Sequence, residues 1–146
     1  MRGPHYAAGT AAAFLLGWTQ RAVSGNYREA IADPNFDAED SLQRTSKVRS
    51  HYGYVINLEQ EITKDLGAFG RFSWRDARSE IMSWADMDQT LSFGTSLKGT
   101  MWGRPHDTWG LAVAFNELSR SHADYLAAGG FGVTVGDGAL NYSGER

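Results

Sequence analysis

The sequence contains no cysteine, only three prolines and no long hydrophobic run. Without cysteine the chain has neither a disulfide framework nor a thiolate metal site. Its longest weakly polar stretch covers residues 7–18, which is too short for a transmembrane helix, since such a helix needs about 20 apolar residues. This stretch is not typical of a secretory signal peptide either, because its basic region is a single arginine, Arg2, and no small-x-small cleavage site follows Trp18.

An excess of either charge is also missing. The chain has 14 Lys and Arg against 17 Asp and Glu, which gives a net charge of −3. This balance argues against a nucleic-acid partner held by bulk positive charge and against an acidic disordered tail. The histidines have no mutual spacing suited to a metal site. We therefore expect no nucleic acid, no metal and no other cofactor.

Aromatic residues and glycines are abundant: five Trp, six Tyr, seven Phe and 17 Gly. They occur in stretches that alternate between apolar and polar residues, and such period-two alternation predicts strands with two different faces. The clearest stretch is 51–62, and similar patterns cover 68–75, 91–97 and 109–116. A weaker pattern covers 14–21 and a short one 131–135. The sequence therefore predicts about six strands and an all-β fold.

The connections between these stretches differ in length. Residues 64–67 form a tight turn in which Gly67 is expected at positive φ, whereas 23–50 form a long polar loop. Residues 121–128 are expected to form a helical turn or two. Long loops at one end of the strands and short turns at the other are typical of an outer-membrane β-barrel.

Alternation also predicts which residues share a face of the sheet, because a register slip of one residue would exchange the two faces. A soluble β-sandwich would show the same alternation, but the small residues on the polar face here and the aromatics near the strand ends, Trp18 and Trp74 among them, favour a barrel with interfacial girdles. The expected apolar face carries Tyr52, Tyr54, Ile56, Leu58, Phe72, Leu91, Phe93, Leu97, Leu111, Val113 and Phe115. The expected polar face carries Asn57, Glu59, Arg71, Arg75, Ser92, Ser96 and Asn116.

Several segments together resemble the bacterial carbohydrate-selective porin family (OprB-like). They are 52–63 followed by 65–67, then 69–76, 96–99 with 102–105 and 107–108, 118–120 with 124–130, and 136–138 with 140–142. The resemblance is dense over about residues 50–146 and loose over 12–30. It implies an outer-membrane barrel of roughly sixteen strands that lets sugars diffuse passively and catalyses nothing. It also implies that residues 1–146 are one incomplete barrel domain, an antiparallel fragment from the C-terminal half of a longer porin.

The expected partners are mono- or oligosaccharides, outer-membrane lipid and the remaining strands of the full-length barrel. Guanidinium and carboxylate groups bind sugar hydroxyls through charge-assisted hydrogen bonds. On the polar face, the two arginines of one strand are expected to pair with the two glutamates of the neighbouring strand. Two alternatives stay open: a soluble β-sandwich carbohydrate-binding module, and a glycoside hydrolase that uses Glu59 and Glu61 as its carboxylate pair. The candidate pore-lining residues are Asn57, Glu59, Glu61, Arg71, Arg75, Trp84 and Asn116.

Overall fold

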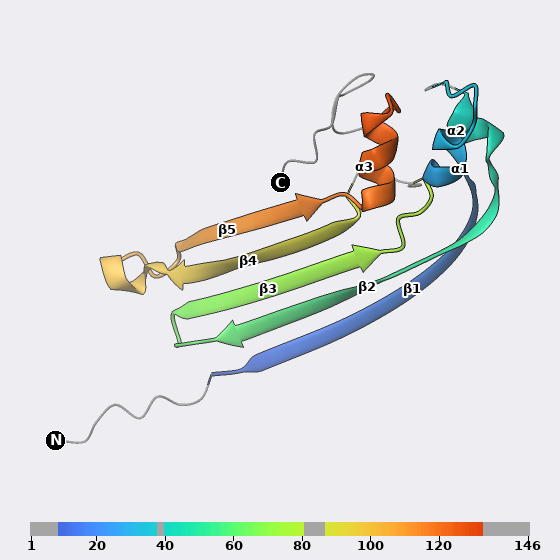
Figure 1. Ribbon diagram of the computed structural model, residues 1–146. Coiled ribbons are helices and arrows are strands. Elements are labelled where there is room, and N and C mark those ends of the chain that lie inside the picture. The colour runs from blue at the N-terminus through green and yellow to red at the C-terminus, as the bar shows by residue number, and fades with distance from the viewer. Residues whose placement is uncertain (1–8, 38–39, 81–86, 133–146) are drawn as a thin grey trace. The chain divides into compact units, whose positions relative to one another are not determined.

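The computed structural model describes residues 9–37, 40–80 and 87–132. Its main element is one antiparallel sheet of five strands that is not closed, with neighbours in chain order (Figure 1). Among the described residues the fold is therefore mostly β, with two short α-helices between β1 and β2 and a third after β5. The strands are β1 Ala11–Ser24, β2 Lys47–Glu61, β3 Leu66–Arg75, β4 Gln89–Lys98 and β5 Thr108–Glu117.

The predicted strands at 51–62, 68–75, 91–97 and 109–116 are confirmed as β2 to β5, and the weaker pattern at 14–21 is confirmed as the middle of a longer strand, β1. The sixth expected strand is not seen in the described part of its range, because residues 131 and 132 have no strand conformation. Residues 133–135 lie outside the described residues. The described residues thus contain five strands rather than six.

The chain divides into two compact units, and each unit is described by itself. The turn unit comprises residues 1–16, 55–73 and 90–115, and the loop unit comprises 17–54, 74–89 and 116–146. The turn unit holds the short β2–β3 and β4–β5 connections, and the loop unit holds the three α-helices.

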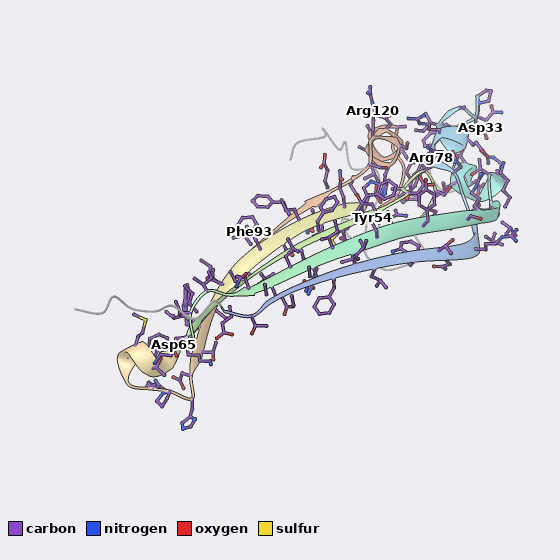
Figure 2. All side chains as sticks on the ribbon, turned by 90° about the horizontal axis from the view of Figure 1, so that it is seen from below. Asp33, Tyr54, Asp65, Arg78, Phe93 and Arg120 are labelled. Atoms are coloured by element: carbon purple, nitrogen blue, oxygen red, sulfur yellow. The ribbon has the colours of Figure 1, made fainter. Side chains whose placement is uncertain are left out.

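Hydrogen bonds at the turns set the strand register of the turn unit. The Ile62 amide donates to the Leu66 carbonyl (2.9 Å), and the Lys98 amide donates to the Asp65 carbonyl (2.8 Å) beside the turn seen in Figure 2. Counting along antiparallel strands from these bonds places Arg71 opposite Asn57 on β2. A bond from the Gly99 amide to the Asp107 carbonyl (2.9 Å) sets the register of β4 and β5 in the same way. Together these bonds place one cross-strand row at the centre of the unit: Glu59, Phe69, Gly94 and Ala112.

The β2–β3 turn differs from the expectation at Gly67, whose predicted positive φ is wrong. The turn is already closed before this residue, because the Thr63 hydroxyl oxygen accepts from the amides of Asp65 (3.3 Å) and Leu66 (3.1 Å). Strand β3 therefore begins at Leu66, and Gly67 is an extended residue. In the β4–β5 connection, the 3₁₀ helix η1 (Gly99–Trp102) ends at Gly103, which does have a positive φ of 75°.

The expected polar loop 23–50 is shorter than predicted, because β1 continues to Ser24 and β2 begins at Lys47. It also contains two helices, α1 (Tyr27–Ile31) and α2 (Ser41–Arg44). Asn26 caps the N-terminus of α1, because its side chain accepts from the Glu29 amide (3.0 Å).

The expected helical turn near 121–128 is confirmed as α3 (Arg120–Ala127). The Ser119 hydroxyl oxygen caps this helix by accepting from the His122 amide (3.2 Å). None of the helices within the described residues has the length and apolar character needed to cross a membrane.

The buried apolar cluster of the chain belongs to these helices, all of which lie in the loop unit (Figure 1). Because the cluster is built from helix residues, its burial holds α1 and α3 together within the loop unit. Its members are Tyr27, Ala30, Tyr125 and Leu126, with Ile31, Phe36, Leu42 and Leu118 packed against them.

The apolar face of the turn unit is exposed. Phe93 stands on one side of β4 (Figure 2), its ring lies 6.2 Å from that of Phe115, and the two side chains are 48% and 59% exposed. In a β-sandwich these residues would form the buried core between two sheets. No second sheet exists among the described residues, so the exposed face counts against the sandwich alternative. The other large apolar residues of the unit with exposed side chains include Ile56, Leu58, Leu91, Leu111 and Val113.

This face gives a first prediction about solution behaviour. The 146-residue chain, produced alone, should aggregate in buffer and become monodisperse only in detergent, because it exposes a broad apolar face and two strand edges, on β1 and β5, that have no partner among the described strands. Light scattering with and without a mild detergent measures this. A monodisperse monomer in detergent-free buffer would contradict it.

Candidate functional site

The polar face of the turn unit carries three side chains joined in a chain of hydrogen bonds. The Arg71 Nε–H group donates to Asn57 Oδ1 (3.1 Å), and Asn57 Nδ2–H donates to Glu59 Oε1 (2.9 Å). The predicted shared face of these three residues is therefore confirmed. We call this group the relay.

The relay replaces the direct pair that we expected between Arg71 and a glutamate. An amide has a donor end and an acceptor end, so Asn57 offers its oxygen to the cation and its NH₂ group to the carboxylate. The reverse orientation would set donor against donor and acceptor against acceptor. Charges at both ends thus fix the amide, and all three groups keep further donors or acceptors exposed to water.

An open groove of about 550 Å³ lies over this region. Glu61, the remaining glutamate of the predicted pair, is exposed and lies on the groove wall with Glu59. All of the lining residues belong to the turn unit. They are Thr10, Ala12, Glu59, Gln60, Glu61, Gly67, Ala68, Phe69, Arg71 and Ser96.

Phe69 is a groove residue that was missed in the sequence. A Cβ atom built on Gly94 would lie 2.7 Å from Phe69 Cε1, so the ring occupies the space above that glycine. Phe69 therefore lies on the polar face, with Arg71, and not on the apolar face. The signal was present, since Phe69 is two residues from Arg71 and strand residues two apart share a face.

Arg75 has a different environment from Arg71. It is only 8% exposed and forms an ion pair with Asp88 from the β3–β4 connection. The expected pairing of Arg75 with Glu59 or Glu61 is not found; its carboxylate partner among the described residues is Asp88. Alternation along β3 indicated the face of Arg75 but gave no sign of what covers it.

Asp88 is the centre of a buried polar network in the loop unit. Its Oδ2 accepts from the Ser119 amide (2.7 Å) and lies 3.1 Å from His122 Nδ1. Burial raises the pKa of Asp88, but the bonds from His122 and Ser119 and the charge of Arg75 outweigh that effect and lower its pKa overall. The His122 ring stacks on Tyr27 at 4.5 Å, so the network joins β3, α1 and α3.

Two further residues, Asn116 and Trp84, were predicted to line the pore. Asn116 is an exposed residue near the end of β5. Trp84 lies outside the described residues, so its expected place at a channel mouth stays a prediction.

Three of the aromatic side chains that were expected near strand ends lie close together. Tyr52 and Tyr54 each lie within 6 Å of Trp74, at 5.9 and 5.6 Å between ring centroids, and form an aromatic group on the apolar face of the loop unit. Trp18 is not on this face. A Cβ atom on Gly53 would lie 2.8 Å from Trp18 Cζ2, so Trp18 shares the face of Gly53, opposite to that of its neighbours Tyr52 and Tyr54.

A sheet with one exposed apolar face and one polar face, carrying charged side chains along an open groove, is typical of the wall of a membrane channel. The family model described as "Carbohydrate-selective porin, OprB family" matches residues 8–145. The chain belongs to this family. No curated protein and no solved structure matches it.

Membership confirms two predictions made from the sequence. Porins of this family are transport channels without catalytic activity, which excludes the glycoside hydrolase alternative. They reside in the bacterial outer membrane, which is therefore the location of this protein.

Proposed function

We propose that residues 1–146 form part of one barrel domain whose polar face lines a water-filled path for the passive diffusion of sugars. The observation that carries this proposal is the relay, which presents a guanidinium, an amide and a carboxylate together on the face opposite to the exposed apolar residues. Further strands of the barrel complete the wall at the edges of β1 and β5, because backbone groups at an open edge have no water to bind within a bilayer.

The chemistry of the relay suits neutral, hydroxylated solutes. A sugar hydroxyl donates to Glu59 and accepts from Arg71, and both are charge-assisted hydrogen bonds. Because the groups already bind one another and water, the exchange for a sugar hydroxyl is nearly balanced, as rapid passage requires. Asn57, Glu59, Glu61 and Arg71 are the contacts that we propose in the turn unit, and Asn116 is a further candidate in the loop unit. Arg75 is not included, since it is buried.

The relay gives a second prediction, which applies to the full-length porin. Replacing Arg71 by alanine should weaken the block of ion current by added sugar and shift ion selectivity toward cations, because a fixed positive charge leaves the wall. Hydrogen bonds to charged groups are worth about 1.5–3 kcal/mol, and competition by water leaves only part of this, so we expect a several-fold loss of sugar affinity. Single-channel recording in planar bilayers measures both quantities.

Arg78→Ala is the control, because this substitution also removes one positive charge. Arg78 is an exposed side chain in the β3–β4 connection, and its partner is Asp76. Arg78→Ala should leave sugar block near the wild-type value. An Arg71→Ala porin with wild-type sugar block and wild-type ion selectivity would remove the relay from the path.

A further inference from the structure

We propose that Phe69 is a stacking surface for the ring of a passing sugar, which makes closed-ring pyranoses bind better in the channel than open-chain alditols of the same size. This inference rests on the proposed function and adds the feature of the solute that the wall recognises. It starts from an aromatic side chain that lines the same groove as Glu59 and Arg71.

The position of the ring is determined by the strand next to it. Gly94 lies between Ser92 and Ser96 on the polar face of β4, and a Cβ atom there would lie 2.7 Å from Phe69 Cε1. The glycine therefore leaves room for the ring to cover the backbone of β4. Covering a strand glycine with a cross-strand aromatic also stabilises a sheet, but that role involves only the side of the ring that faces Gly94. Phe69 is half-buried and is one of the residues that line the groove.

The neighbours of the ring supply the polar half of a sugar site. By the strand register, Glu59 on β2 is the residue directly opposite Phe69. Arg71 is two residues further along β3 on the same face, and both Glu59 and Arg71 line the groove. A pyranose has C–H groups on its ring faces and hydroxyls around its edge. A sugar whose C–H face lies on Phe69 therefore brings its edge hydroxyls toward a carboxylate on one side and a guanidinium on the other.

An open-chain alditol offers the same number of hydroxyl groups or more, but no rigid C–H face. It can use Glu59 and Arg71 but gains little from the aromatic ring. Stacking therefore separates the two kinds of solute, whereas hydrogen bonding to the relay does not.

The loop unit repeats the arrangement with other residues. The Trp18 ring occupies the space above Gly53, with Cζ2 and Cε2 at 2.8 and 2.9 Å from the position of a Cβ atom, and the side chain is 38% exposed. In each unit, then, a glycine on the polar face of one strand accommodates an aromatic ring from the next.

The test compares two solutes on the full-length porin: methyl β-glucopyranoside, which is locked as a ring, and sorbitol, which is open. Block of single-channel current by each is titrated for wild type, Phe69→Leu and Phe69→Trp. Leucine keeps apolar bulk without an aromatic face, so the affinity for the pyranoside should fall about two- to tenfold, the range of an aromatic stacking contribution. Sorbitol block should not change, and tryptophan should restore or strengthen pyranoside block.

Phe93→Leu is the matched control, because it makes the same substitution on the next strand but on the opposite, apolar face. It should leave both blocks unchanged, and unaltered open-channel conductance shows that each variant folds. If Phe69→Leu leaves pyranoside block at the wild-type value, or weakens both solutes equally, the stacking role is overturned. If wild type itself is blocked by neither solute, the proposed function fails first, and the two results are distinguishable.

Discussion

Replacing Asp88 by alanine should loosen the docking of α3 by about 3–5 kcal/mol, the usual cost of removing one partner from a buried ion pair. The side chain of Asp88 is 2% exposed and binds the Arg75 guanidinium, the His122 ring and the Ser119 amide. Without the carboxylate, the buried guanidinium of Arg75 keeps no counter-charge in the network. Arg75 Nε already lacks a hydrogen-bond partner among the described residues, so the guanidinium has little else to bind.

Hydrogen exchange of the α3 amides in the full-length porin measures this cost, since the amides exchange through local opening. A cost of 3–5 kcal/mol corresponds to exchange at least about 100-fold faster. Asp124→Asn is the control, because Asp124 is an exposed carboxylate on the same helix. In this variant the α3 amides should exchange as in wild type. Wild-type protection of α3 in Asp88→Ala would show that the network does not hold the helix.

The dependence on pH follows from the direction of the pKa shift. Because the folded pKa of Asp88 lies below its value in an unfolded chain, its ionised form stabilises the docked state above the unfolded pKa of about 3.9. That contribution declines as the pH falls below the unfolded pKa and is lost at the folded pKa. The difference in α3 protection between wild type and Asp88→Asn should therefore be constant from neutral pH to about pH 5 and should shrink in stronger acid. A difference that instead disappears between pH 8 and 6 would contradict this.

Most of the sheet could be predicted from the sequence because its physics is local. Period-two alternation arises because residues two apart along a strand point to the same face. It placed β2 to β5 to within a few residues at each end. It also placed Asn57, Glu59 and Arg71 on one face, where they form the relay. Alternation was weakest for β1, where the consecutive residues Phe14, Leu15 and Leu16 are apolar on both faces, and there it gave no sign of the side on which Trp18 lies.

The parts that could not be predicted depend on contacts between segments far apart in the sequence. Nothing near Arg75 in the sequence indicates that Asp88 and His122 will bury it, because that requires the β3–β4 connection and α3 to pack together. The relay depends on an amide placed between two charges, and alternation ranks Asn57 only as one more polar residue. Phe69 was overlooked because an apolar residue on a polar face is read as a fault in the pattern, although Gly94 on the next strand provides the room for it.

An arginine introduced at Val113 should destabilise the full-length porin far more than one introduced at the adjacent Ala112. Successive strand residues point to opposite faces, and Val113 belongs to the exposed apolar face while Ala112 lies in the row of Gly94 on the polar face. On the lipid face near the middle of the bilayer, an arginine costs about 2–4 kcal/mol, because its charge loses water and gains no partner. On the wall of a water-filled path the same side chain stays hydrated, so its cost should stay below about 1 kcal/mol.

The measurement is the urea dependence of folding into lipid vesicles, with tryptophan fluorescence as the signal, for wild type, Val113→Arg and Ala112→Arg. The two variants share the introduced arginine, the strand and the change in net charge, and they differ in the direction of the side chain and in the loss of a valine or an alanine. The expected order of stability is wild type, then Ala112→Arg close to it, then Val113→Arg well below. Equal costs at the two positions would mean that both faces meet the same surroundings, and the assignment of one face to lipid and the other to water would be wrong. A larger cost at Ala112 would exchange the two faces and remove Glu59, Arg71 and Phe69 from the sugar path together, since all three belong to the face of Ala112.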